Sequence, residues 1–227
     1  FDLDACTEYG VMATNAPDVL NETTADFAWA LMMATARRVT ESEHWLRAGK
    51  WEKWSYNAFL GADIHGATLG ILGMGRIGRA IARRARGFDM QVIYHNRSPL
   101  EKHLEVEAGG ATYVEKEALL RNADHLIIVV PFSADTHHLI GVRELAWMKS
   151  TATLVNIARG GIVDDAALIE ALQGNRIAAA GLDVFENEPR FNRGFLGLHN
   201  VVLTPHIASA SHRTRLAMAH KAAENLV

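Results

Sequence analysis

The sequence predicts an α/β fold, a doubly wound and mostly parallel sheet with helices on both faces. From residue 68 onward, short apolar runs rich in β-branched residues alternate with stretches of helical spacing. A glycine-rich turn joins the first of these runs to the helix that follows it. Crossovers between parallel strands are right-handed, so they place helices on both faces of the sheet.

The first predicted element is a helix. Thr23, with Asp26 three positions later, resembles a capping arrangement, so we expect the helix to start near Thr24. Over 27–39 it is apolar nearly all round, which predicts burial on more than one side, against a core or a subunit interface. Three tryptophans crowd the next segment, and we interpret them as packing residues rather than a ligand cage. They are Trp45, Trp51 and Trp54.

The rest of the chain supplies the strands and the helices between them. The predicted strands are 68–72, 91–94, 112–114, 125–130, 153–157, 178–184 and 200–203. The clearest helices between them are 77–86, 143–148 and 164–173. The final stretch, 211–227, also has helical spacing, and it could pack beside the first helix or return to another domain.

Composition excludes several classes of protein. With 227 residues, 49% apolar and 22% charged, the chain can build a sizeable core and should not be disordered. Its formal charge of -3 offers no basic field, so we expect no nucleic-acid partner. The single cysteine, Cys6, allows no intrachain disulfide and no cysteine-based zinc site, and we predict no metal. A lone cysteine and no secretion or membrane-spanning signal predict a cytoplasmic protein with no membrane partner.

A phosphate-binding turn is predicted at 73–78, where the sequence reads GMGRIG. Gly73 allows a tight turn, Gly75 lets the backbone approach a pyrophosphate, and Gly78 lets the helix pack closely on the strand. The amides at the helix N-terminus would then face the anion. Arg76 could add a side-chain contact or lie free on the surface. The alternative is a tight strand-to-helix turn that binds nothing.

Three charged side chains follow strands in the second half of the chain, where ligands of open α/β sheets bind. Arg159 follows strand 153–157, Glu188 follows strand 178–184, and His206 follows strand 200–203. The other histidines, such as His137 and His138, lack this placement, and we interpret them as surface residues.

These residue types suit the reduction of a 2-keto acid. A guanidinium such as that of Arg159 binds a carboxylate in a bidentate fork and polarises the adjacent ketone. His206 could deliver a proton as hydride arrives, and the carboxylate of Glu188 could orient its ring. The alternatives are a salt-bridged arginine, a solvated glutamate and a packed histidine.

Several separated motifs in one order carry a family resemblance. They are TTAD at 23–26, GILGMGRIG at 70–78, NIARGG at 156–161, GLDVF at 181–185, EP at 188–189 and PH at 205–206. The chain resembles the NAD(P)-dependent D-isomer-specific 2-hydroxyacid dehydrogenases, most closely their glyoxylate/hydroxypyruvate (2-ketogluconate) reductase branch. The resemblance implies a Rossmann-type coenzyme domain and a catalytic set of Arg159, Glu188 and His206.

The resemblance also implies further cofactor contacts. The pyrophosphate would be held by Gly73, Gly75, Arg76, Ile77 and Gly78. The adenosine side would be lined by Pro131 and Thr136, and the nicotinamide side by Ile157, Ala158 and Asp183. The nicotinamide ring would lie near Ala208 and Ser209. Family members carry a substrate domain ahead of the point where this chain begins, so we expect most of that second domain to be absent from this chain. We assign 1–16 to its remnant and a linker, 17–207 to the dinucleotide-binding domain, and 208–227 to a C-terminal helix returning toward the substrate domain.

The cofactor is predicted to be NADP(H). Asn96 lies where an NAD-specific enzyme places the acid that binds the ribose 2′-hydroxyl. Asn96 and Ser98 can hydrogen-bond a 2′-phosphate, and Arg97 can pair with its charge. The alternative is an NAD enzyme that simply lacks the acid.

We therefore predict an NADPH-dependent reductase of glyoxylate, hydroxypyruvate or similar acids, including 2-ketogluconate. It should be a homodimer, because family members usually dimerise through the long helix near 27–39. The rival function is a dinucleotide-sensing binding protein or corepressor on the same fold. Formate oxidation is disfavoured, because formate dehydrogenases of this superfamily pair the histidine with a glutamine, whereas Glu188 is acidic.

Overall fold

The computed structural model describes residues 2–226, and they contain one parallel sheet of seven strands. Its strand order is β3-β2-β1-β4-β5-β6-β7. The strands are β1 (Thr68–Leu72), β2 (Gln91–His95), β3 (Thr112–Tyr113), β4 (His125–Ile128), β5 (Thr153–Asn156), β6 (Ala179–Leu182) and β7 (Val201–Leu203). All seven correspond to predicted strands and differ from the prediction only at their ends. The doubly wound fold class is therefore confirmed.

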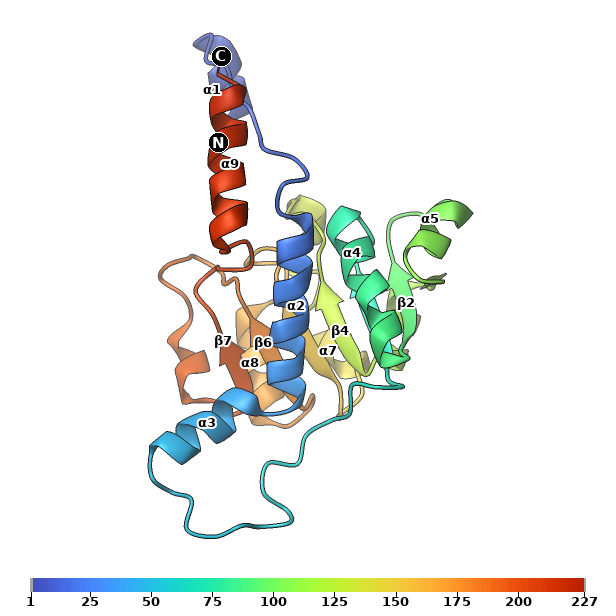
Figure 1. Cartoon of the computed structure of the whole chain (residues 1–227), viewed down its shortest axis with the longest axis vertical. Coiled ribbons are helices and arrows are strands. Elements are labelled where there is room, and N and C mark those ends of the chain that lie inside the picture. Colours follow the sequence, from blue (N-terminus) through green and yellow to red (C-terminus); the bar gives the residue numbers. More distant parts are fainter. Residues whose placement is uncertain (1, 227) are drawn as a thin grey trace.

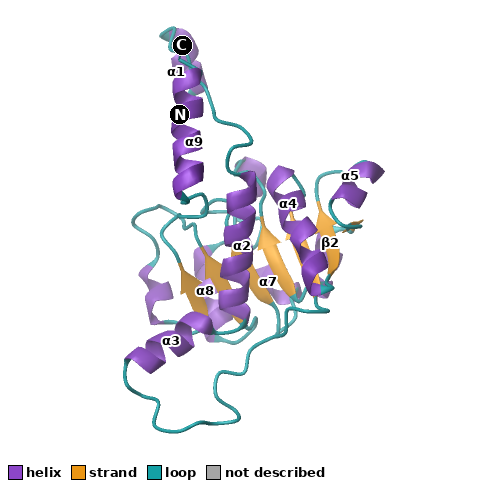
Figure 2. Cartoon of the chain, in the orientation of Figure 1, coloured by secondary structure: helices purple, strands orange, loops and turns teal. Residues whose placement is uncertain are grey.

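Helices cover both faces of this sheet (Figures 1 and 2). One face carries α2 (Asn21–Ala36) and α4 (Arg76–Ala85), which pack against each other. The opposite face carries α6 (Lys116–Asn122), α7 (Val142–Trp147) and α8 (Asp165–Gln173), which pack in sequence order. A short helix, α5 (Lys102–Glu107), precedes β3, and 3-10 turns occur at η1 (Arg86–Phe88), η2 (Ala134–Thr136) and η3 (Arg193–Gly197). The helices predicted over 77–86, 143–148 and 164–173 are α4, α7 and α8.

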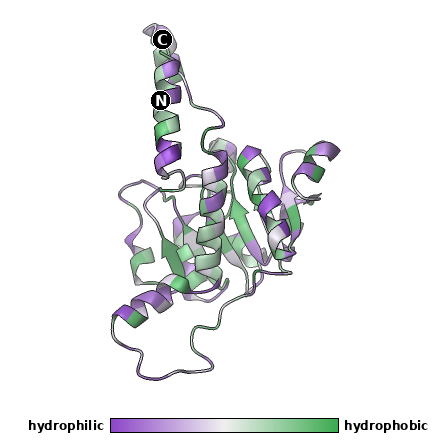
Figure 3. Ribbon diagram, viewed as in Figure 1, coloured by the Kyte–Doolittle hydropathy of each residue, from purple (hydrophilic) through white to green (hydrophobic). Residues whose placement is uncertain are grey.

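The central strands are largely apolar because both of their faces are buried, and Figure 3 shows hydrophobic colouring over much of β4. Side chains alternate between the two faces of a strand. In β4, Leu126 and Ile128 belong to the core under α6, α7 and α8, whereas Ile127 belongs to the core under α2 and α4. The strand order reverses at β1, which has β2 on one side and β4 on the other. Such a reversal opens a crevice beyond the carboxyl ends of the strands.

The predicted limits of the first long helix were wrong at both ends. α2 begins before Thr24, and no side chain caps it. Thr23 does not cap the helix, because its hydroxyl lies 2.5 Å from the Thr214 hydroxyl instead. At the other end, Arg38 has a left-handed backbone with φ 53° and separates α2 from the next helix. Because α2 packs on α4 and on β5, β6 and β7, this chain itself covers the helix on more than one side.

The segment that follows α2 exposes much of its apolar surface. It consists of α3 (Val39–Arg47) and a long loop, and we call residues 39–60 the apolar arm. Trp45 packs edge-on against Phe59, with ring centroids 5.4 Å apart. Trp51 is 59% and Trp54 74% exposed. The interpretation of these two tryptophans as packing residues is therefore wrong within the described chain, because the arm extends away from the sheet (Figure 1).

Two helices lie near the chain ends, α1 (Leu3–Glu8) and α9 (His212–Glu224). The Asp2 carboxylate caps α1, and the Ser211 hydroxyl accepts a hydrogen bond from Thr214 N at the start of α9. The Asn225 side chain donates to the Asn15 carbonyl at 2.8 Å, so the end of α9 meets the segment after α1. The predicted helix over 211–227 is α9, although residue 227 lies outside the described residues. Between residues 2 and 226, no helix combines the length and apolarity that a membrane span requires.

Candidate active site

The glycine-rich turn has the geometry that each glycine was expected to provide. Gly73 has φ 105°, and a Cβ there would lie 2.8 Å from the Val129 carbonyl carbon. A Cβ on Gly78 would lie 2.3 Å from the Gly73 carbonyl oxygen, so this helix packs closely on the turn. A Cβ on Gly75 would meet no atom within 4 Å. The open space lies at the one glycine where a ligand was expected to approach the backbone.

The first turn of α4 is free of side-chain caps. Gly75 is the N-cap residue, and α4 carries no acidic side chain in its first turn. The amides at such a helix end attract an anion. Arg76 points its guanidinium toward Asp18, with Nε 3.1 Å from the carboxylate oxygen, and both side chains are exposed. A pyrophosphate at the start of α4 would therefore lie near Arg76, whose side chain already has Asp18 as an exposed acidic neighbour.

The end of β2 lies beside the same turn. The Asn96 side-chain oxygen accepts a hydrogen bond of 2.7 Å from the Met74 amide, so Asn96 holds the glycine-rich turn in place. Arg97 and Ser98 are exposed. Within residues 2–226 Arg97 forms no ion pair, and its charge is available for a ligand. The sequence indicated that Asn96 lies at the end of this strand, but it did not reveal the hydrogen bond from the Met74 amide.

His206 and Glu188 meet at the ends of β7 and β6. His206 Nδ1 lies 2.8 Å from Glu188 Oε2, and Glu188 Oε1 accepts a hydrogen bond of 2.7 Å from the Phe185 amide. Both oxygens of the Glu188 carboxylate therefore have a partner, and the contact through Oε2 orients the His206 ring. The His206 side chain is 48% exposed, so its other ring nitrogen can reach a substrate. The structure thus brings together the predicted histidine and glutamate.

The fully buried Asp183 holds the His206 loop. Its carboxylate accepts hydrogen bonds of 2.8 Å from the amides of Ile207 and Ala208 and one of 2.7 Å from the Thr204 hydroxyl. The His206 amide donates to the Asp183 carbonyl at 2.9 Å. Asp183 therefore anchors both sides of His206, a role that its position after a strand did not reveal. Ser209, next to Ala208, is partly buried.

Arg159 lies in the turn after β5. The buried Asn156 shapes this turn, because its side chain accepts from the Ala158 amide and donates to the Arg159 carbonyl. Gly160 packs so closely on the next loop that a Cβ would lie 1.7 Å from the Phe185 carbonyl oxygen. The exposed Arg159 side chain donates to the Ala158 carbonyl at 2.6 Å, and no acid pairs with it within the described residues.

These loops enclose a cleft of about 720 Å³ at the carboxyl ends of the strands. It brings together seven of the predicted site residues, namely Ile77, Pro131, Ile157, Ala158, Arg159, Glu188 and His206. Phe132 and Phe185 also line it, and neither was predicted as a site residue. In the sequence, only their positions directly after Pro131 and Val184 indicated that they could lie in the site. Thr136 does not line the cleft, and its hydroxyl instead donates to the Pro131 carbonyl at 2.8 Å.

Comparison with known proteins identifies relatives of the whole arrangement. Residues 29–208 match the family described as D-isomer specific 2-hydroxyacid dehydrogenase, NAD binding domain. The chain is 48% identical to the glyoxylate reductase of Thermococcus kodakarensis and 51% identical to that of Korarchaeum cryptofilum. Each alignment covers 100% of this chain and 68% of the relative.

Solved structures of reductases also resemble this chain. The glyoxylate reductase from Paecilomyes thermophila superposes with a TM-score of 0.90 at 42% identity, over 100% of this chain and 67% of that one. The NADPH-dependent glyoxylate/hydroxypyruvate reductase from Sinorhizobium meliloti, solved in complex with NADP and malonate, gives a TM-score of 0.90 at 40% identity. That match covers 100% of this chain and 69% of the other.

Proposed function

The chain belongs to the D-isomer-specific 2-hydroxyacid dehydrogenase family, and we propose that it reduces glyoxylate, hydroxypyruvate and similar small 2-keto acids with NADPH. Family membership makes it an NAD(P)-dependent oxidoreductase. The observation that carries the proposal is the 2.8 Å pair of His206 and Glu188 in the cleft that Arg159 also lines. The products would be D-2-hydroxy acids, and 2-ketogluconate is a further candidate substrate.

The glycine-rich turn fits the dinucleotide. Space above Gly75 and the uncapped amides of α4 suit a pyrophosphate, and the cleft continues from Ile77 to His206. The bound cofactor supplies the hydride. Buried Ile157 and Ala158 form an apolar part of the cleft wall.

Arg159 would bind the substrate carboxylate. Its guanidinium is exposed in the cleft, and within the described residues no carboxylate competes for it. A bidentate fork would hold the keto acid with its carbonyl oxygen toward His206. The close packing of Gly160 on Phe185 ties this arginine turn to the loop that carries Glu188.

His206 would act as the general acid. As negative charge develops on the ketone oxygen, a protonated imidazole can donate its Nε2 proton there. The Glu188 carboxylate stabilises that imidazolium through Nδ1, and the buried Asp183 fixes the loop around it. A positioned acid of this kind contributes a rate factor of about 100 or more.

The preference for NADPH is proposed from the end of β2. Residues 95–98 contain no acid that would repel a 2′-phosphate, and Arg97 and Ser98 are exposed there. Since the Asn96 oxygen is taken by the Met74 amide, Arg97 carries most of this argument. A hydrogen bond to a charged group is worth about 1.5 to 3 kcal/mol, or about 10-fold to 150-fold in affinity.

The chain would act as a homodimer, with the apolar arm rather than α2 as the contact surface. Trp51, Trp54 and Tyr56 are 59%, 74% and 79% exposed on this arm. A groove of about 710 Å³ lies between the arm and η3, and it could receive the arm of a second copy. Light scattering should give twice the chain mass, and Trp54→Asp should lower that mass. A monodisperse wild-type monomer at micromolar concentration would contradict the dimer.

A steady-state assay tests the activity. Purified protein should oxidise NADPH in the presence of glyoxylate and of hydroxypyruvate, and His206→Gln should slow this by about 100-fold or more while cofactor binding stays nearly intact. Cofactor binding without turnover of either acid would instead favour the dinucleotide-sensing alternative. Wild-type turnover in the His206 variant would show that the proton donor is misassigned. Localisation in the cytoplasm stays a prediction from the sequence.

A further inference from the structure

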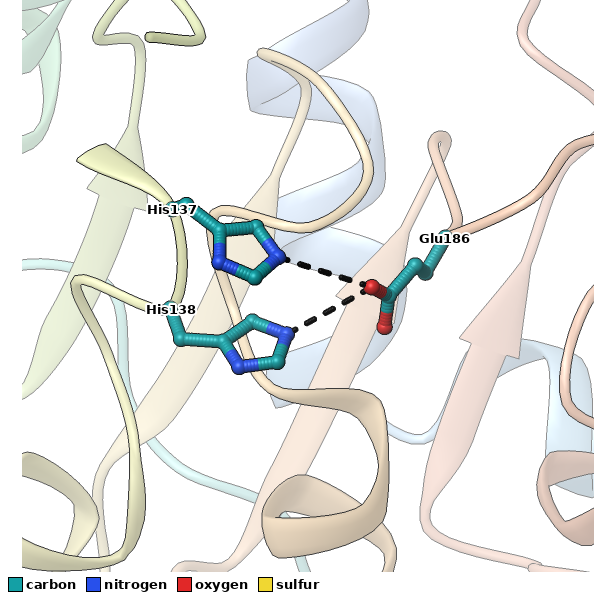
Figure 4. Close-up of side chains that lie close together, drawn as sticks. All are labelled: His137, His138 and Glu186. Atoms are coloured by element: carbon teal, nitrogen blue, oxygen red, sulfur yellow. Dashed lines mark ion pairs between the residues drawn. The ribbon is translucent and has the colours of Figure 1, made fainter. Parts of the chain in front are cut away.

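Two histidines and a glutamate converge beside the cleft without forming part of the proposed reaction. His137 and His138 follow η2, and Glu186 follows β6. The His137 and His138 Nε2 atoms lie 3.7 and 3.5 Å from the same Glu186 oxygen, Oε1 (Figure 4). Both histidines are partly exposed, in keeping with their interpretation as surface residues, but the sequence did not reveal their approach to Glu186, which lies far away along the chain.

The backbone holds the two rings in position. The His138 amide donates to the Gly161 carbonyl at 2.7 Å, and the Ile140 amide donates to the Ile162 carbonyl at 3.1 Å. The rings stack with centroids 3.9 Å apart and planes 20° from parallel. Both imidazoles therefore present an edge to the Glu186 carboxylate, as Figure 4 shows.

Hydrogen bonding alone does not satisfy this cluster. Both nitrogen-to-oxygen distances exceed an ordinary hydrogen bond. Within the described chain, His138 Nε2 and Asp165 Oδ2 are shielded from solvent and have no hydrogen-bond partner. Unpaired nitrogen beside crowded acidic groups is an environment that a cation would stabilise.

The separations suit a small divalent cation. One ligand atom from each of His137, His138 and Glu186 can be chosen so that all three lie within 4.8 Å of one another. Zinc binds histidine nitrogen and carboxylate oxygen at about 2.0 to 2.2 Å, which places tetrahedral ligands about 3.4 Å apart. The two nitrogen-to-oxygen separations of 3.7 and 3.5 Å are already close to that spacing.

We propose that His137, His138 and Glu186 bind one divalent cation of the zinc type, with a fourth position open to water. Imidazole nitrogen favours zinc, nickel and cobalt over magnesium and calcium. The side chains are 47%, 36% and 34% exposed, although His138 Nε2 is itself shielded from solvent. Asp165 is buried nearby, and the proposal does not require it as a ligand.

The cation would join two loops that border the cleft. His137 and His138 share a loop with Phe132, and Glu186 lies between Phe185 and Glu188. Because Phe132, Phe185 and Glu188 line the cleft, a shared ion would link its two sides. The inference concerns binding and loop order, and it stands or falls independently of the proposed reduction.

Zinc titration of the protein tests the site. Protein without a polyhistidine tag is stripped with a chelator, and zinc is then titrated in competition with a chromogenic chelator. We expect one saturable equivalent in the wild type and an affinity at least about tenfold weaker in His138→Ala and in Glu186→Gln. His103→Ala is the matched control, because His103 also lies beside one acid, Glu101, at 3.2 Å. Among residues 2–226, His103 belongs to no cluster of three such ligands.

Two further measurements guard against misfolded variants. Zinc should raise the thermal unfolding midpoint of the wild type and of His103→Ala, but not that of a His137→Ala/His138→Ala double variant. Cobalt bound to the wild type should give the visible absorption spectrum of a low-coordinate site. The double variant should give no such spectrum. Absence of a saturable equivalent in the wild type would overturn the proposal and leave an imidazole–carboxylate ion-pair cluster. Unchanged zinc affinity in a folded double variant would overturn it too.

Discussion

Glu188→Gln is the sharpest perturbation of the proposed site, because both oxygens of the Glu188 carboxylate are in use. Oε1 accepts from the Phe185 amide at 2.7 Å, and Oε2 lies 2.8 Å from His206 Nδ1. Glutamine offers one acceptor oxygen and one donor nitrogen. Since the Phe185 amide can only donate, it should take the oxygen and leave the new amide group facing Nδ1.

The variant therefore loses a hydrogen bond that stabilises the protonated imidazole. Hydrogen bonds to charged groups contribute about 1.5 to 3 kcal/mol, so kcat/KM for glyoxylate should fall by about 10-fold to 150-fold. His206 would then present Nδ1 as an acceptor and meet the substrate as a neutral ring. NADPH affinity, measured by fluorescence titration, should stay close to that of the wild type.

Glu170→Gln is the matched control, since Glu170 is an exposed glutamate on α8 outside the cleft. Its kcat/KM should equal that of the wild type. A Glu188→Gln enzyme within about threefold of wild-type kcat/KM would refute the reasoning. In that case the 2.8 Å pair would be a packing contact of the loop and not part of the proton-donating machinery.

Three other changes have defined outcomes. Arg159→Lys keeps the charge but loses the fork, so the apparent KM for the keto acid should rise more than kcat falls; an unchanged KM would contradict its role. Arg97→Ala should reduce the ratio of NADPH to NADH affinity by about 10-fold to 150-fold; equal wild-type affinities, or an unchanged ratio, would refute the NADPH assignment. Burial of Glu144 favours a higher pKa, but hydrogen bonds from Arg143 and Lys116 outweigh it and lower the pKa to about 2. The resulting stability, at most about 3 kcal/mol before solvent screening, is present above about pH 4.5 and is lost as pH falls toward 2. Urea unfolding should therefore show Glu144→Gln less stable than wild type at pH 7, with the difference shrinking below pH 4; a constant difference would contradict the linkage.

The parts of the fold that could be predicted are those in which local pattern and tertiary environment agree. Residues 126–130 form an unbroken apolar run, because helices cover both sides of the sheet at this strand. The glycine turn was recognisable because Gly73 and Gly78 answer separate steric demands, and Gly75 leaves open space between them. Arg159, Glu188 and His206 could be predicted to lie near one another because the carboxyl ends of parallel strands share one edge of a sheet.

The contacts that could not be predicted from the sequence are those between residues that lie far apart along the chain. Thr23 looked like part of a helix cap, but its hydroxyl meets that of Thr214, which lies 191 residues further along the chain. Asn96 looked free for a cofactor, but its oxygen meets the Met74 amide. An apolar side chain such as Trp54 reveals its tendency to be buried but not what covers it. Local patterns carry no information on such pairings.

The precision of the proposed site also comes from such distant contacts. Gly160 leaves no room for a side chain against the Phe185 carbonyl, and Phe185 in turn donates its amide to Glu188. The loop bearing Arg159 and the loop bearing Glu188 are therefore in direct contact, and Glu188 passes that constraint to His206. Arginine, glutamate and histidine come from three different strand ends, but an unbroken series of backbone and side-chain contacts links them. A change at Gly160, which touches no substrate in this scheme, should for that reason disturb Arg159 and His206 together.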